Sequence, residues 1–151
     1  MTDAALKSQA ITLEIIREFD APVEKVYNAF VDPAVFASWM GPEGVSVGSC
    51  ALDVREGGAW ACQMKTPDGS DPFVSGVYKE IVPNARLAFT WAWRQEDGSR
   101  GNETLVSLTF EEKDGKTAFR LFQTGFAETE FRDHHNQGWT SSFDCLEKAL
   151  V

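Results

Sequence analysis

Residues 128–150 read ETEFRDHHNQGWTSSFDCLEKAL, and this stretch decides the fold of the chain. Large side chains recur along it at steps of three and four, with an imidazole at the start: His135, Trp139, Phe143, Leu146 and Leu150. This spacing keeps side chains on one face of a 3.6-residue helix. We therefore predict a long amphipathic helix near the end of the chain, with one buried face.

Gly138 is the weak point of this predicted helix, because glycine in a helix interior costs about 1 kcal/mol relative to alanine. Next to the large Trp139, the glycine either lets the helix approach a sheet closely or leaves space beside the indole. Indole, phenyl and imidazole groups together form a mixed wall that suits an amphipathic ligand. The same buried face is also what an ordinary core requires, and both interpretations stay open.

The rest of the chain is mostly strand and turn. Residues 10–19 alternate apolar and polar side chains, which predicts a half-buried strand. Pro22 and Asp32-Pro33 then mark the starts of two short helices. Six further strands are predicted between 45 and 123, separated by glycine, proline and aspartate turns, and a change of apolar parity near Gly48 indicates a bulge.

A curved antiparallel sheet with one apolar face needs that face covered, and only the stretch 128–150 is long enough to cover it. The predicted fold class is α+β. It consists of a curved antiparallel sheet of six to seven strands wrapped around a long C-terminal helix, with two short helices after the first strand. A cavity is expected wherever the two surfaces do not fill each other.

Length and charge narrow the function classes. The 151 residues fit one domain, for which we predict the range 10–151 after a flexible leader, 1–9. A net charge of −9 disfavours binding to nucleic acid or to anionic membranes. No apolar run is long enough to span a bilayer, and the N-terminus lacks the hydrophobic core of a signal peptide, so we expect a cytoplasmic protein.

The residues that commonly carry chemistry are few. Cys50, Cys62 and Cys145 show no CxxC spacing, and we expect three buried thiols in a reducing cytosol rather than a disulfide. His134 and His135 are adjacent, but nothing around them has the spacing of a metal site. No nucleophile with its base and no phosphate-binding glycine motif is found. We predict no metal, no cofactor and no catalytic residue.

Five segments, in chain order, carry a resemblance: REFDAPVEKVYNAFVDPAVFASWMGPEG, DVREGGAWACQM, GVYKEIVPNARLAFTW, ETLVSLTFEEKDGKTAFRLFQTGF and GWTSSFDCLEKAL. The chain resembles the START-like (SRPBCC, helix-grip) superfamily and, within it, the family similar to the C-terminal domain of the activator of Hsp90 ATPase. The resemblance implies a helix-grip fold with an internal cavity. In that family the position of Gln123 often holds a histidine or another polar residue facing the cavity, and the amide here argues against proton transfer.

Three functions of different class remain open. The first is non-catalytic binding of a small hydrophobic or aromatic molecule between the sheet and the C-terminal helix. The second, implied by the resemblance, is a partner protein that stimulates an Hsp90-type chaperone ATPase. The third is a cyclase or dehydratase that uses His135 or Tyr78 as acid or base. We favour the first and predict these ligand-binding residues: Trp39, Trp60, Tyr78, Phe89, Trp91, Gln123, His135, Trp139 and Phe143. An exposed sheet edge leaves a monomer and a homodimer both open.

Overall fold

The computed structural model describes residues 11–41 and 44–150. One strand is followed by two short helices, six strands and a long helix, as the sequence predicts. The elements are β1 (Thr12–Phe19), α2 (Val23–Val31), α3 (Pro33–Trp39), β2 (Ser46–Leu52), β3 (Ala59–Lys65), β4 (Phe73–Val82), β5 (Arg86–Trp93), β6 (Thr104–Lys113), β7 (Lys116–Thr124) and α4 (Thr129–Ala149).

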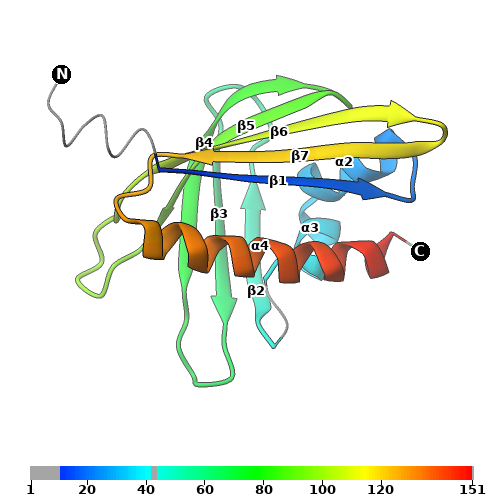
Figure 1. Ribbon diagram of the computed structural model, residues 1–151. Helices are drawn as coiled ribbons and strands as arrows, with labels where there is room; N and C mark the ends of the chain where they lie inside the picture. The colour runs from blue at the N-terminus through cyan, green and yellow to red at the C-terminus, as the bar shows by residue number, and fades with distance from the viewer. Residues whose placement is uncertain (1–10, 42–43, 151) are drawn as a thin grey trace, which may run out of the picture.

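The seven strands form one antiparallel sheet in the order β1-β7-β6-β5-β4-β3-β2 (Figure 1). Strands β2 to β7 follow one another as a meander, and β1 returns to pair with β7, with Ile15 opposite Leu121. The register of β2 against β3 shifts between Val47 and Ser49, so the bulge predicted at Gly48 is confirmed. The sheet is curved, and its two edge strands are β1 and β2.

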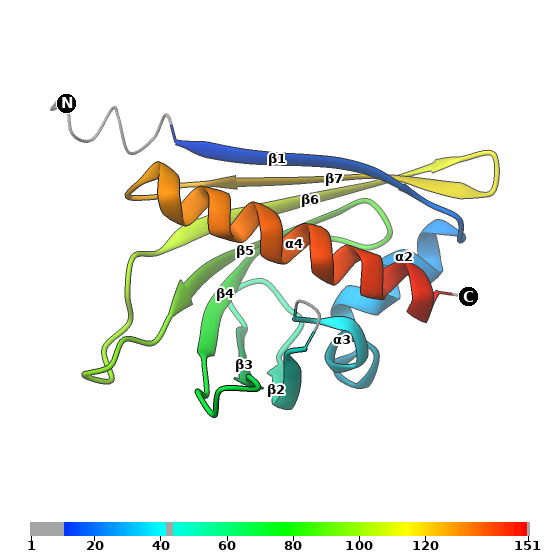
Figure 2. The same ribbon diagram turned by 60° about the horizontal axis from the view of Figure 1, so that its bottom comes forward.

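Helix α4 lies across the inner face of the sheet, and α2 and α3 lie beside the C-terminal part of α4 (Figure 2). The ammonium of Lys25 on α2 donates to the carbonyl of Leu150 at 2.7 Å. On the β1 side, the Arg17 guanidinium pairs with Asp144 of α4 at 2.6 Å. The helix is therefore fixed near its C-terminal end from two sides. This arrangement is the expected helix-grip fold of class α+β.

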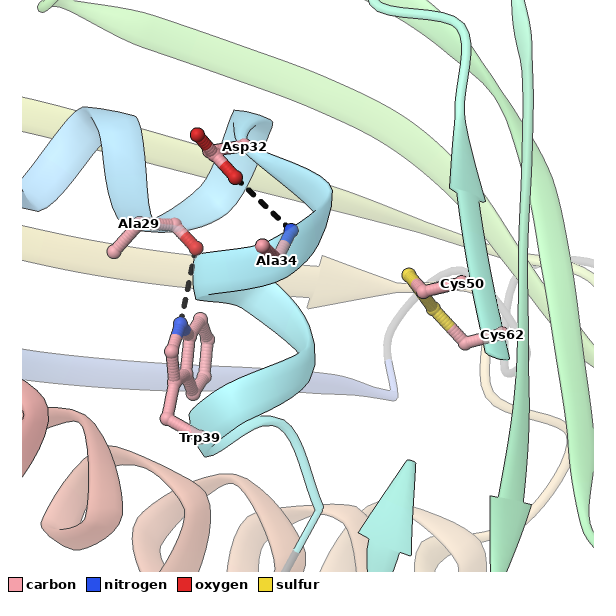
Figure 3. The surroundings of a disulfide bond; sticks show 6 residues. All are labelled: Ala29, Asp32, Ala34, Trp39, Cys50 and Cys62. Atoms are coloured by element: carbon pink, nitrogen blue, oxygen red, sulfur yellow. Dashed lines mark hydrogen bonds between the residues drawn. A yellow bond between two sulfur atoms is a disulfide. The ribbon is translucent and has the colours of Figure 1, made fainter. Parts of the chain in front are cut away.

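The break between α2 and α3 follows from Asp32-Pro33. The Asp32 carboxylate accepts from the backbone N–H of Ala34 at 2.9 Å, which caps α3 (Figure 3). Pro33 fits the first turn because that position needs no N–H donor. The Trp39 indole then donates to the carbonyl of Ala29 at 2.9 Å, which folds α3 back onto α2.

An aromatic cluster fills the space between α2, the sheet and α4. The Phe30 ring stacks on Phe119 at 5.5 Å, and Phe119 meets the edge of Phe143 at 5.1 Å. Phe110 lies 5.6 Å from Phe30 and 5.5 Å from Phe119, and Trp39 lies 6.2 Å from Phe143. All five residues are buried, so this end of the interface is packed core.

The cysteine prediction is wrong for two of the three residues. Cys50 on β2 and Cys62 on β3 are direct partners in the antiparallel ladder, with Cα atoms 4.3 Å apart, and they form a disulfide (Figure 3). The physical reason is the hairpin register, which brings both side chains to the same place on neighbouring strands. Cys145 on α4 is a free thiol and is only half-buried.

Two further predictions concern the N-terminal leader and membrane-spanning segments. The predicted leader, residues 1–9, lies outside the described residues. Across 11–41 and 44–150, no helix has both the length and the apolar character needed to cross a membrane.

Candidate functional site

A cavity of about 310 Å³ lies beside the middle of α4, away from the aromatic cluster. Strand β5 supplies Trp91 and Trp93 to its wall, β3 supplies Met64, and α4 supplies His135, Gly138 and Trp139. The α3–β2 connection and the β3–β4 hairpin complete the lining with Met40, Gly41, Val45, Thr66 and Pro72. The cavity therefore sits between sheet and helix, where the sequence predicts one.

Gly138 is the reason that α4 leaves space at this point. A Cβ atom built at Gly138 would meet nothing within 4 Å. The residue is one position before Trp139, so the helix presents bare backbone beside a large indole. Of the two roles predicted for this glycine, the structure supports open space rather than close approach to the sheet.

Three indoles form the aromatic wall. Trp91 lies 4.9 Å from Trp139 with the rings tilted by 47°, and it meets Trp93 edge-on at 5.5 Å. Trp139 is also stacked on Phe143 at 5.5 Å, and this contact ties the cavity wall to the packed cluster. Such ring arrangements contribute roughly 0.5–1.5 kcal/mol per pair beyond area burial.

A buried chain of hydrogen bonds holds this wall in place. The Trp139 indole donates to Oε1 of Gln123 at 2.9 Å, and Nε2 of Gln123 donates to the Thr104 hydroxyl at 2.8 Å. That hydroxyl donates to the carbonyl of Trp91 at 3.2 Å. Gln123 is fully buried and its amide is engaged on both sides, so it positions Trp139 rather than facing the cavity.

His135 is held as the neutral Nδ1-protonated tautomer. Its Nδ1 lies 2.7 Å from the carbonyl of Phe131, which can only accept. Its Nε2 receives the indole N–H of Trp93 at 3.0 Å and that of Trp91 at 3.3 Å, both of which can only donate. Burial lowers the pKa of His135, and the neighbouring His134 lowers it further, whereas the bond to Phe131 works in the opposite direction.

Few polar groups remain for a ligand. Ser142 lines the cavity and is only 2% exposed, and its hydroxyl has no hydrogen-bond partner among the described residues. The Thr66 hydroxyl is engaged with Asp68 and Ser70 at the tip of the β3–β4 hairpin. His134 is exposed and stands at the cavity edge. Among the described lining residues, the Ser142 hydroxyl is thus the one free hydroxyl in a largely apolar space.

The nine predicted ligand-binding residues separate into three groups. Trp91, His135 and Trp139 line the cavity. A second group surrounds a separate hollow of about 10 Å³, too small for anything but a water molecule: Trp60, Tyr78 and Phe89. The last three belong to packed core: Trp39, Gln123 and Phe143. A role in binding stays a prediction for the first group.

The second group is fixed by its own contacts. The Trp60 indole donates to the carbonyl of Thr90 at 3.1 Å and packs edge-on against Phe89 at 5.5 Å. Burial, with smaller effects from the charges of Tyr27 and Asp53, raises the pKa of Tyr78 well above its usual range. Tyr78 is therefore a neutral phenol at physiological pH and unsuited to act as a base.

The cavity residues absent from the predicted ligand-binding set are Met64, Trp93, His134, Gly138, Ser142 and the loop residues. Trp93 and Met64 share strand parity with Trp91 and Trp60, so their inward direction was visible in the alternation. Ser142 lies three positions after Trp139 and belongs to the same helical face. Within the described residues, no group of three or more His, Cys, Asp or Glu side chains is placed to hold a metal ion.

A curved antiparallel sheet closed by a long helix, with an apolar cavity between them, places the protein in the START-like helix-grip class. Residues 20–151 match the family described as "Activator of Hsp90 ATPase homolog 1-like protein", and the chain belongs to that family.

Solved structures agree with this assignment. The chain is 32% identical to the AHSA1 protein from Silicibacter pomeroyi, with a TM-score of 0.85 over 92% of this chain and 96% of that one. A protein from Chromobacterium violaceum is 26% identical, with a TM-score of 0.84 over 93% and 96% of the two chains. An uncharacterised protein of Schizosaccharomyces pombe is 29% identical over 107 residues, 71% of this chain but 27% of that protein's length.

Proposed function

We propose that this protein binds a small, neutral, largely aromatic molecule in the cavity between β5 and α4, without changing it chemically. The observation that carries the proposal is the space of about 310 Å³ walled by Trp91, Trp93 and Trp139 and left open by Gly138. Ligand pockets range from roughly 300 to 1,000 Å³, so the volume favours a compact molecule over a long lipid chain.

The charge of the site favours a neutral ligand. No lysine, arginine, aspartate or glutamate is among the described residues that line the cavity. A carboxylate or phosphate moved into such a space would lose its hydration without gaining a partner. The net charge of −9 also repels anions approaching the protein. A single hydroxyl or carbonyl on the ligand would match Ser142.

The arrangement of the acid–base candidates favours binding over catalysis. An acid–base catalyst needs a free proton site with a pKa near the working pH. Both nitrogens of His135 are engaged, and Tyr78 is buried outside the cavity with a raised pKa. The Ser142 hydroxyl has no described base within hydrogen-bond reach to activate it as a nucleophile.

Stimulation of an Hsp90-type ATPase is the second candidate function, and the family match favours it. It predicts that the chain added to such a chaperone increases the rate of ATP hydrolysis. A rate unchanged at saturating chain concentration would exclude this function and leave ligand binding untouched.

The direct test of ligand binding fills the cavity from the helix. Gly138→Met adds a flexible apolar side chain to open space, and methionine is about 1 kcal/mol better than glycine in a helix, so folding should not suffer. Gln137→Met places the same side chain one position away on the exposed surface and is the matched control. Tryptophan fluorescence would follow titrations with neutral flavonoids, polyketide-like phenols and, for comparison, fatty acids.

A neutral aromatic compound should quench the tryptophan emission of the unmodified protein and of Gln137→Met with equal affinity. In Gly138→Met its affinity should fall by about tenfold or more, equivalent to about 1.4 kcal/mol. Equal affinity in both variants would show that the ligand binds elsewhere. Failure of every neutral compound to bind the unmodified protein would count against the proposed function itself.

A further inference from the structure

A second hollow of about 220 Å³ lies at the N-terminal end of α4, on the other side of His135. Its lining comes from the end of β5, the β5–β6 connection, the β7–α4 connection and the first turns of α4, and includes Trp93, Gln95, Asn102, Phe126, Phe131 and His135. None of the functions considered above uses it. Its volume is large enough for a ring system.

Trp91, Trp93 and His135 line both hollows and form the wall between them. Because Nε2 of His135 accepts from both indoles, at 3.0 and 3.3 Å, the three rings are locked to one another. The Phe126 ring packs against the imidazole at 5.2 Å from the second side. The wall between the two hollows is therefore fixed by hydrogen bonds and ring contacts.

The lining of the second hollow differs in chemistry from that of the first. Aromatic faces are present in Trp93, Phe126 and Phe131, but two primary amides stand among them. The Asn102 side chain donates to the carbonyl of Gly125 at 2.9 Å, and no described group donates to its Oδ1. In Gln95 the open group is the donor. Its Oε1 accepts from the Ser99 hydroxyl, and no described acceptor meets its NH₂ group.

Gln95 and Asn102 are both exposed, and each leaves one amide group open at the edge of a hollow that is lined by aromatic side chains. A planar lactam or amide-bearing ring carries both an N–H and a C=O on one edge and an apolar face. We propose that the second hollow is a separate binding site for a neutral planar molecule with such an amide-like edge. The proposal does not depend on the first cavity holding a ligand.

The test uses 2-quinolone, a planar lactam, and its N-methyl derivative, which keeps the carbonyl but lacks the N–H. NMR spectra of the ¹⁵N-labelled protein report the side-chain amides of Gln95 and Asn102 and the indole of Trp93. We expect 2-quinolone at millimolar concentration to shift these three signals while the indole of Trp139 moves little. The N-methyl derivative should bind at least threefold more weakly.

Three variants test which of the two hollows binds 2-quinolone. Phe131→Ala removes an aromatic wall that is 50% exposed, and Gln95→Ala removes the open donor on an exposed loop, so both should fold. Each should weaken 2-quinolone binding at least threefold, whereas Gly138→Met, which fills the first cavity, should leave it unchanged. Loss of binding in Gly138→Met alone, or no shift of the three signals up to the solubility limit, would overturn the proposal.

Because Gly138→Met and Phe131→Ala act on different hollows, the two proposals fail in different ways. A protein that binds flavonoids normally but ignores 2-quinolone has only the first site. One that binds 2-quinolone but no neutral aromatic compound in a Gly138-dependent manner has only the second.

Discussion

The two halves of the interface between α4 and the sheet are both rich in aromatic side chains, yet one is filled and the other is hollow. At the filled half, Phe143 on α4 meets Phe119 on β7 and Phe30 on α2. At the hollow half, Trp139 on α4 meets Trp91 on β5 beside a cavity of about 310 Å³. The positions on the helix are only one turn apart.

The two halves differ in what packs against the interface in addition to the sheet and α4, that is, on its third side. Helix α2 inserts Phe30 between sheet and helix, and α3 adds Trp39, so the filled half has rings on three sides. At the hollow half, the third side consists of the α3–β2 connection and the β3–β4 hairpin, and α4 contributes Gly138. Aromatic content therefore does not distinguish core from cavity, whereas the presence of a third packing layer does.

Truncation at the filled half should have the largest effect. Phe143→Ala would leave a void surrounded by fixed rings and should lower the free energy of unfolding by about 3–5 kcal/mol. Met64→Ala, at the hollow half, removes a side chain that already borders empty space and should cost about 2 kcal/mol, the low end for such changes. Urea denaturation measures both. Equal losses would remove the distinction between the halves.

Gln123→Met should have the next largest effect. The methionine fills similar volume but leaves the Trp139 indole and the Thr104 hydroxyl without their partner, which costs about 1–3 kcal/mol. In a Trp139→Phe background the indole donor is already absent, so the same substitution should cost less. Chemical denaturation of the four proteins in this cycle gives the coupling. Additive losses would mean that the bond does not position the indole.

Gly138→Ala, at the hollow half, should raise the stability of the protein instead of lowering it. Because the added Cβ meets nothing within 4 Å, the helix should gain up to about 1 kcal/mol of stability from the better helix former. Thermal denaturation would show a higher midpoint. Gly76→Ala is the contrasting control, since its Cβ would lie against the carbonyl of Thr90 and should destabilise the protein. A destabilised Gly138→Ala protein would show that the helix at this position is tightly packed.

The smallest expected effect is that of pH on the wall between the hollows. Burial is the first cause that lowers the pKa of His135 below its ordinary value of about 6.5, so the unfolded chain takes up this proton before the folded one does. Stability from this group is therefore complete above about pH 6.5 and declines as the pH falls toward the lowered folded pKa.

The groups around the His135 imidazole determine which variant is the control for this pH dependence. Trp91 and Trp93 on β5, Phe126 before α4 and the Phe131 carbonyl are uncharged. Within 11–41 and 44–150, His134 is the one titratable neighbour that affects the pKa of His135. Unfolding measured between pH 7.5 and 5 should show a shallower decline in His135→Phe than in the unmodified protein. His134→Gln should retain most of the slope. An identical slope in His135→Phe would assign the pH dependence to other residues.

The sequence predicts the fold more completely than the site, for physical reasons. Alternation of apolar residues places Leu13, Trp91 and Leu121 on the inner face because strand side chains have a period of two. Helical spacing likewise places Trp139 and Phe143 on the buried face of α4. Neither pattern contains the distance between the two surfaces, so it cannot tell which of these aromatic residues borders empty space.

Two features were nevertheless within reach of the sequence. Cys50 and Cys62 are equidistant from Glu56 in the hairpin, so a register centred on that turn pairs them directly. Gly138 in the interior of a long helix indicated either close approach to the sheet or space beside Trp139, and the sequence left both open. The loops that complete the cavity carry no periodic pattern, and their contribution depends on how α3 and the β3–β4 hairpin fold back.

The pairing of β1 with β7 also determines when the protein can fold during its synthesis. Thr12 is opposite Thr124, and α4 begins only at Thr129, so the first strand waits for its neighbour until almost the whole domain has left the ribosome. Until then, Leu13 and Phe19 and the inner face of the growing meander are exposed to water. The long sequence separation of this one strand pair slows its formation, because it costs more loop-closure entropy than the hairpins of the meander.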